Sequence, residues 1–179
     1  GYDFGSLTSL TDALNRTTRG YHDAAGRLIG LRDPLGNLTQ YKYDKLDRLV
    51  LLTDALQNAT QLAYDENGNL KSVKDALNQT TGYSYDPRDR VQSLSDPLLK
   101  TETYVYDGNG NLKTFTDRKQ QITSTVYDEL DRPKVVTFHD GHTQTYTWDA
   151  GDRLRKIVDS AGGTIERDYD NFDRLIKET

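Results

Sequence analysis

An aromatic residue followed by aspartate recurs every 21 residues, and this period constrains the fold more than any other feature of the chain. The aromatic residues of these pairs are Tyr43, Tyr64, Tyr85, Tyr106, Tyr127, Trp148 and Tyr169. His22-Asp23 keeps the same register one step earlier, whereas Tyr2-Asp3 is one residue out of step. A constant period of 20 to 50 residues is typical of repeat architectures, in which each repeat is one small structural unit. We therefore interpret the chain as an array of about eight repeats.

Each repeat contains a turn directly after the aromatic residue. With the aromatic residue counted as position 1, position 2 is Asp and position 5 is Gly or Asp. An Asp followed three residues later by Gly is typical of a type I turn in which the Asp side chain accepts backbone N–H groups. Gly and Asp both tolerate a positive φ, which explains why they alternate at position 5. The turn residues that we expect to be most informative are Asp44, Gly68, Asp86 and Gly110.

Two apolar positions follow this turn. Position 7 is leucine in six of the repeats, and position 10 is apolar as well. The position-7 leucines are Leu28, Leu49, Leu70, Leu112, Leu154 and Leu175. The two positions are three residues apart, so strict strand alternation would place them on opposite faces of a sheet. Either a β-bulge intervenes or both faces are partly covered, and the sequence leaves these alternatives open.

The second half of the repeat has its own turn and its own strand. Position 12 is Asp in most repeats, and the residues after it alternate in the manner of Thr39-Gln40-Tyr41-Lys42-Tyr43. This period-2 pattern of β-forming residues predicts a strand, and two turn signals within 21 residues leave no room for a helix of about 11 residues. The sequence therefore predicts an all-β fold, a curved or spiralling antiparallel sheet of about eight 21-residue hairpin repeats.

Equivalent side chains of successive repeats should form rows across such a sheet. We expect the position-1 aromatic residues to form an aromatic ladder and the position-7 leucines to form a second ladder. Cross-strand pairs of this kind contribute about 0.2–1 kcal/mol each. The ladder residues would then hold neighbouring hairpins together.

The repeat pattern also predicts the domain organisation. We expect one array over residues 1–179, with an irregular first repeat over 1–20, regular repeats over 21–168 and a truncated last repeat over 169–179. The repeat at 127–147 is a variant, because Pro133 replaces the position-7 leucine and Phe138 replaces the position-12 aspartate. The Asp-Gly pair that follows Phe138 predicts a shortened turn there. We interpret the whole as a segment of a longer array.

Composition narrows the classes of partner. The net charge is −5 and the isoelectric point is about 5.2, which argues against a nucleic-acid surface and against a polybasic membrane contact. No apolar run approaches the roughly 18–20 residues of a membrane span, so we expect no membrane insertion. The chain has no Cys, which excludes disulfides and thiolate chemistry.

No catalytic or metal-binding residue can be selected from the sequence. His139 and His142 flank Asp140, but they lack the three or four converging ligands that zinc requires. The Asp107–Asn111 stretch resembles the start of a calcium loop, but Leu112 stands where the loop needs glycine. We therefore expect no metal, no cofactor and no enzymatic activity, with the repeated aspartates serving as turn residues.

Trp148 and Tyr146 are the candidates for ligand contact. Their rings offer flat apolar faces with a polar group, which suits stacking on a carbohydrate. A place in the aromatic ladder explains the same residues, and we favour that interpretation. Carbohydrate binding stays open as an alternative.

The repeat resembles the YD repeat of bacterial Rhs proteins, whose consensus is close to Tyr-Asp-x-x-Gly-Arg-Leu. The matching stretches are residues 22–28, 64–70 and 106–112, read as HDAAGRL, YDENGNL and YDGNGNL. Similar repeats occur in wall-associated bacterial proteins, in toxin-complex B and C subunits and in teneurins. The resemblance covers essentially the whole chain.

This resemblance implies a structural role and a location. In the family, YD repeats build a hollow β-shell that encloses a C-terminal toxin until delivery, often by type VI secretion or in a toxin complex. The expected partners are therefore the C-terminal toxin cargo or the rest of the shell, and the expected location is secreted or at the bacterial cell surface. The self-cleaving segment of the family is not matched, so no catalytic residue is carried over.

A surface-exposed module that binds carbohydrate or a partner is the alternative function. The exposed edges of an open sheet also invite pairing between molecules, so self-association through sheet edges is a further expectation.

Overall fold

The computed structural model describes residues 6–179, and Tyr2-Asp3 lies outside this part of the chain. The described residues form seventeen strands and no helix, so the expected all-β class is confirmed. None of the described residues belongs to a helix that could cross a membrane. The chain divides into two compact units, one ending at Ser84 and the other beginning at Tyr85. The assignment of residues 1–179 to a single array stays a prediction.

The strands have similar lengths in both units. Up to the division they are β1 (Ser6–Thr11), β2 (Thr17–His22), β3 (Leu28–Arg32), β4 (Leu38–Tyr43), β5 (Leu49–Thr53), β6 (Ala59–Tyr64), β7 (Leu70–Lys74) and β8 (Thr80–Tyr85). The second unit holds β9 (Val91–Ser95), β10 (Thr101–Tyr106), β11 (Leu112–Thr116), β12 (Ile122–Tyr127), β13 (Pro133–Thr137), β14 (Thr143–Trp148), β15 (Leu154–Asp159), β16 (Gly163–Tyr169) and β17 (Leu175–Glu178).

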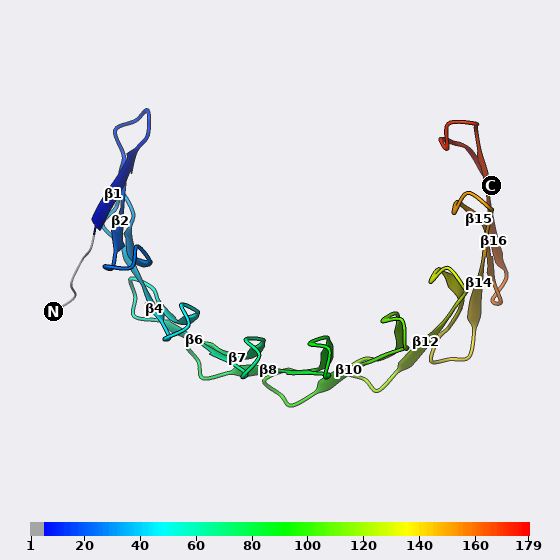
Figure 1. Cartoon of the computed structure of the whole chain (residues 1–179), viewed down its shortest axis with the longest axis horizontal. Helices are drawn as coiled ribbons and strands as arrows, with labels where there is room; N and C mark the ends of the chain where they lie inside the picture. Colours follow the sequence, from blue (N-terminus) through cyan, green and yellow to red (C-terminus); the bar gives the residue numbers. More distant parts are fainter. Residues whose placement is uncertain (1–5) are drawn as a thin grey trace. The chain divides into compact units, whose positions relative to one another are not determined.

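Consecutive strands pair in antiparallel fashion within each unit. The first unit is a meander from β1 to β8. The second unit is a meander from β9 to β17. Within each unit the sheet is curved, and the hairpins follow one another in sequence order (Figure 1). The expected curved antiparallel sheet of hairpin repeats is therefore confirmed in each unit.

In hairpins of both units, the strand after the first turn carries a β-bulge opposite the position-1 residue. Tyr43 lies opposite Leu49, but Lys42 lies opposite Leu51, so Val50 is an extra residue on β5. The same shift in register occurs beside His22, Tyr64, Tyr106, Tyr127, Trp148 and Tyr169. The bulge brings positions 7 and 10 onto one face, because Leu49 and Leu52 oppose Tyr43 and Tyr41, which are two residues apart on β4. The alternative with a bulge is thus the correct one.

Both turns of the repeat are closed by the same pair of backbone hydrogen bonds. In the first turn the N–H of Asp44 donates to the carbonyl of Arg48 and the N–H of Asp47 donates to the carbonyl of Asp44. The second turn repeats this pattern from Asp54 to Asn58. Position 5 has a positive φ at Gly26, Asp47, Gly68, Asp89, Gly110, Asp131, Asp152 and Asp173, which confirms the expected left-handed residue.

The shortened turn expected in the variant repeat is wrong. The N–H of Phe138 donates to the carbonyl of His142, and the N–H of Gly141 donates to the carbonyl of Phe138. This is the bonding pattern of Asp117–Gln121 in the preceding repeat, so the turn keeps its length. Backbone geometry fixes the turn, with Gly141 at φ 86°, and does not need an aspartate at position 12.

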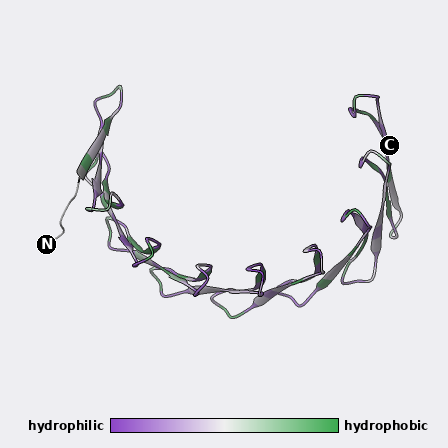
Figure 2. Cartoon of the chain, in the orientation of Figure 1, coloured by the Kyte–Doolittle hydropathy of each residue, from purple (hydrophilic) through white to green (hydrophobic). Residues whose placement is uncertain are grey.

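The sheet has no dry interior. Between residues 6 and 179 no hydrophobic side chain is fully buried, and Leu35 and Leu56 are 87% and 84% exposed at the tips of turns. Hydrophobic and hydrophilic residues are interleaved along the hairpins (Figure 2). Because no thick core forms, contacts between neighbouring hairpins must contribute much of the stability.

Candidate functional site

The Asp at position 2 organises the first turn of each repeat. In the repeat of Tyr43, one carboxylate oxygen of Asp44 accepts the backbone N–H groups of Leu46 and Arg48 at 2.8 and 3.0 Å. Its other oxygen accepts Nε of Arg48 at 2.8 Å. Asp86 accepts the same three kinds of bond in its own turn. The prediction that these aspartates accept backbone N–H groups is confirmed.

These bonds stabilise the charged form of the aspartates. The backbone N–H of Arg48 beside Asp44 is the main cause that holds the pKa of that carboxyl below its usual value. At Asp86 the main cause of the lowered pKa is the hydrogen bond from the Arg90 side chain. Hydrogen bonds to a carboxylate favour its ionised form, so these side chains are poor proton donors or acceptors near neutral pH.

The aromatic residue at position 1 reaches back to the preceding repeat. The hydroxyl of Tyr43 donates to the carbonyl of Leu28, fifteen residues earlier, at 2.8 Å. The equivalent bonds are Tyr64 to Leu49, Tyr106 to Val91, Tyr127 to Leu112, Trp148 Nε1 to Pro133 and Tyr169 to Leu154, at 2.8–3.0 Å. Each aromatic residue thereby satisfies the position-7 carbonyl of its neighbour.

The predicted ladder residues occupy one interleaved row in each unit. Tyr43 lies between Leu28, which accepts its hydroxyl, and Leu49, which opposes it across the strand pair. The remaining cross-strand partners are Tyr64 with Leu70, Tyr106 with Leu112, and Trp148 with Leu154. Tyr85 is half-buried at the end of β8. The contribution of this row to stability stays a prediction.

The arginine at position 6 joins one repeat to the next, which sequence reasoning missed. Arg132 binds Asp128 of its own turn and Asp152 of the next repeat, both at 2.6 Å. Its guanidinium also lies over the ring of Trp148, with the carbon 5.6 Å from the ring centroid. Arginine recurs at position 6 in Arg27, Arg48, Arg90, Arg132, Arg153 and Arg174, and this recurrence was the available signal.

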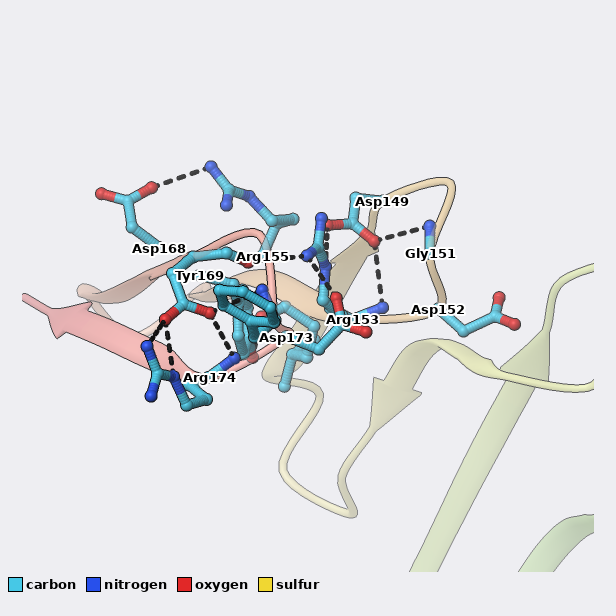
Figure 3. Close-up of polar contacts among 12 residues, drawn as sticks. Asp149, Gly151, Asp152, Arg153, Arg155, Asp168, Tyr169, Asp173 and Arg174 are labelled. Carbon is cyan, nitrogen blue, oxygen red and sulfur yellow. Dashed lines mark hydrogen bonds and ion pairs between the residues drawn. The ribbon is translucent and has the colours of Figure 1, made fainter.

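The last junction shows the arrangement most clearly (Figure 3). Arg153 binds Asp149 in its own turn at 2.8 Å and Asp173 of the next turn at 2.7 Å. Its guanidinium carbon lies 5.4 Å from the ring centroid of Tyr169. The Asp149 carboxylate also accepts the backbone N–H of Gly151. One side chain therefore connects two turns and an aromatic ring.

Glycine at position 5 changes this connection. Gly110 stands where other repeats carry Asp, and Nη1 of Arg90 is buried without a hydrogen-bond partner. A Cβ atom at Gly110 would lie 3.4 Å from that nitrogen. At Gly68 the corresponding Arg48 donates instead to the carbonyl of Asp65, at 3.3 Å. Arginine finds a carboxylate in the next repeat where position 5 is Asp, as the junctions of Arg132 and Arg153 show.

Of the two candidate carbohydrate residues, Trp148 belongs to this row, whereas Tyr146 bonds within its own strand. Trp148 donates its ring nitrogen to the carbonyl of Pro133, and Arg132 covers its ring. The Tyr146 hydroxyl donates to the side chain of Gln144 at 2.8 Å. Both aromatic side chains are half-buried. Trp148 thus takes the place that tyrosine has in the other repeats.

The remaining polar clusters are parts of turns. Nδ1 of His142 pairs with Asp140, and the ring of His142 stacks on Phe138 with centroids 4.3 Å apart. One oxygen of Asp107 accepts the backbone N–H groups of Asn109, Gly110 and Asn111. Among residues 6–179, no three His, Cys, Asp or Glu side chains gather as metal ligands would.

Comparison with known sequences identifies one family. The RHS Repeat family model matches residues 2–37, 22–59, 64–101 and 127–165, which together make up more than half of the chain. No curated protein sequence matches it.

Solved structures with a similar fold come from toxin complexes. A TcdB2-TccC3-Cdc42 crystal structure is 22% identical, with a TM-score of 0.72 over 89% of this chain and 10% of that chain. A Tc holotoxin pore from Photorhabdus luminescens, with a mutation in TccC3, gives the same identity and TM-score over 90% of this chain and 10% of that chain. A TcdB2-TccC3 crystal structure is 23% identical, with a TM-score of 0.71 over 89% and 10%. This chain spans about a tenth of the length of each of these matched chains.

Proposed function

Because the chain belongs to the RHS repeat family, we propose that it is a non-enzymatic wall segment of an Rhs-type β-shell that encloses a C-terminal toxin and takes part in its delivery. The observation that carries this proposal is the bonding between successive repeats. Position-1 aromatic residues in both units donate to a carbonyl of the preceding repeat, as Tyr64 does to that of Leu49. Each repeat provides hydrogen bonds that the preceding repeat needs, so a wall can be extended by adding further repeats.

The fold likeness supports the same role. The structures that resemble this chain are assemblies whose names include toxin-complex subunits, and one of them is a holotoxin pore. We infer that the partners of this segment are the rest of a shell and a toxin cargo. We also infer export from a bacterium, either by type VI secretion or in a toxin complex.

The chemistry of the turns supports a structural role over catalysis. The acidic side chains that recur most, such as Asp44 and Asp86, direct their oxygens at N–H groups of their own turns. A general acid or base needs a pKa near the working pH, whereas these aspartates have lowered pKa values.

Cryo-electron microscopy of the full-length protein that contains this segment tests the proposal. We expect residues 6–179 to form a strip of a closed wall, with one face of the sheet toward an interior that holds density for another part of the polypeptide. A map in which both faces of this strip contact solvent would contradict the proposal.

Protection from protease gives a second test on the same protein. We expect the enclosed part of the chain to resist digestion in the native protein and to become sensitive after incubation below about pH 4 opens the aspartate turns. Equal sensitivity before and after opening would argue against enclosure. The same part expressed alone, without the repeats, serves as the matched control and should be digested rapidly.

A further inference from the structure

Two arginines lie directly opposite each other near the beginning of the described chain. Arg19 on β2 pairs in register with Arg32 on β3, and both side chains are exposed. Side chains directly opposite on antiparallel strands have Cβ atoms about 4.5–5.5 Å apart, and like charges at such positions destabilise a sheet. This pair therefore lowers stability unless an anion lies against it.

The repeat architecture does not require this pair. The equivalent cross-strand pairs in five other hairpins are Gln40 with Thr53, Gln61 with Lys74, Thr103 with Thr116, Ser124 with Thr137, and Thr145 with Val158. None of these five pairs places two like charges together. The two opposed arginines are thus particular to this hairpin of the first unit, and the repeat pattern does not explain them.

A third arginine and a surface depression complete the arrangement. Arg16, Arg19 and Arg32 line one depression between the turn at residues 12–16 and the turn at residues 33–37. Nε of Arg16 binds Asp12 at 2.7 Å, which fixes the direction of its guanidinium. Within the described part of the chain, neither Arg19 nor Arg32 forms an ion pair.

The acidic residues beside the depression are occupied by their own turns. One oxygen of Asp33 accepts the backbone N–H groups of Leu35 and Asn37, and the other accepts the side-chain amide of Asn37. Asp12 accepts the backbone N–H groups of Leu14 and Arg16 together with the Arg16 side chain. These carboxylates reduce the local positive charge but do not bond to Arg19 or Arg32.

We propose that Arg16, Arg19 and Arg32 form a binding site for a phosphate group. Guanidinium groups offer paired N–H donors that match the oxygens of a phosphate, and charge-assisted bonds of this kind are the strong ones. A doubly charged phosphate neutralises both opposed arginines, whereas a single carboxylate would leave one unpaired. The depression is open to solvent, so the group is a free phosphate or the phosphate of a lipid headgroup. This site goes beyond the wall function and does not depend on it.

Thermal unfolding in phosphate and in chloride at matched ionic strength tests the site. At a phosphate concentration ten times the dissociation constant, the melting temperature of the chain should rise by about 3–6 °C above its value in chloride. Arg19→Gln and Arg32→Gln should each remove this gain. Phosphate also stabilises proteins in general by its exclusion from their surface, but that effect is common to all variants.

Lys74→Gln is the matched control, because Lys74 has the same strand position as Arg32 and lies opposite a neutral residue. This variant should keep the full response to phosphate. In chloride, Arg32→Gln should melt at a higher temperature than the parent chain, because the repulsion is removed, while Lys74→Gln should melt at the parent temperature. A phosphate response that is equal in all variants would overturn the proposal, and so would a lower melting temperature of Arg32→Gln in chloride.

Sedimentation with vesicles distinguishes the sources of the phosphate. Binding to phosphatidic acid vesicles, whose headgroup is a phosphate monoester that can carry two negative charges, would identify a lipid headgroup if it is lost in Arg32→Gln. A response to inorganic phosphate without binding to vesicles would identify a free phosphate. A chain that binds neither inorganic phosphate nor vesicles would refute the site.

Discussion

At the scale of single residues, the arginine at position 6 stabilises its own turn and also binds the next repeat. The arginine binds the aspartate that begins its own turn, reaches the position-5 aspartate of the next turn and covers the next aromatic ring. Because the same side chain contacts two repeats, its contribution to stability depends on the residue at position 5 of the next repeat.

Gly110→Asp should supply a second carboxylate for Arg90, whose Nη1 has no hydrogen-bond partner. Asp at position 5 of other repeats has φ near 60°, and a Cβ at Gly110 would meet only the flexible end of Arg90, at 3.4 Å. We expect the melting temperature to rise by about 1–3 °C, since an exposed ion pair adds little and a left-handed Asp costs some of that gain. In the Arg90→Gln background the same substitution should give no rise. An equal effect in both backgrounds would show that the two residues are not coupled.

Tyr64→Phe should remove the bond to the carbonyl of Leu49 and change nothing else in the ring. The loss of one partly buried hydrogen bond should lower the free energy of unfolding by about 0.5–1.5 kcal/mol. Tyr146→Phe is the control, because the Tyr146 hydroxyl binds the Gln144 side chain in the same strand and joins no two repeats. Denaturant unfolding of the two variants measures the difference. If the control is destabilised as much as Tyr64→Phe, the bond between repeats has no special role.

At the scale of the element, the hairpin depends on its two turns and its bulge. The sequence was sufficient to predict the turns, because Asp at positions 2 and 12 and Gly or Asp at position 5 have local physical causes. The bulge could only be left open, since the three-residue spacing of Leu49 and Leu52 is compatible with two arrangements. The turn at Phe138 was mispredicted because its unusual side chain suggested a change that the backbone does not make.

Asp54→Ala tests the side-chain contribution to the second turn. The substitution removes the acceptor for the N–H groups of Leu56 and Asn58 and for the Asn58 amide. We expect the melting temperature to fall by about 2–4 °C, as for the loss of a capping side chain. Asp54→Asn keeps one oxygen acceptor and should lose less than half of that amount. Equal losses in the two variants would mean that charge matters more than the backbone bonds.

At the scale of the whole molecule, the same turn chemistry is repeated many times. The aspartates whose pKa is lowered include Asp44, Asp54, Asp86, Asp128 and Asp170, in both units. What the sequence could not predict is the coupling between repeats, because Arg132 and Asp152 are twenty residues apart and meet only through the sheet. The 21-residue pattern was sufficient to predict the fold class, but neither that pattern nor the family resemblance indicated this network.

The repeated aspartates predict that the protein is sensitive to acid. A carboxyl with a lower pKa in the folded state than in the unfolded state stabilises the fold above its unfolded value, about 3.9, and this contribution is lost as pH falls through the folded value. The melting temperature should therefore vary little between about pH 5 and 7 and fall steeply below about pH 4. Circular dichroism melts over this range measure the effect. A melting temperature that stays constant through the acid range would contradict the role assigned to the turns.

Nuclear Overhauser contacts in solution test whether each repeat completes the one before it. We expect contacts from the Tyr64 ring to Leu49 and from the Tyr127 ring to Leu112, residues fifteen positions apart that are joined through the tyrosine hydroxyl. Tyrosine rings that contact only residues of their own repeat, with none of these fifteen-residue contacts, would contradict this expectation.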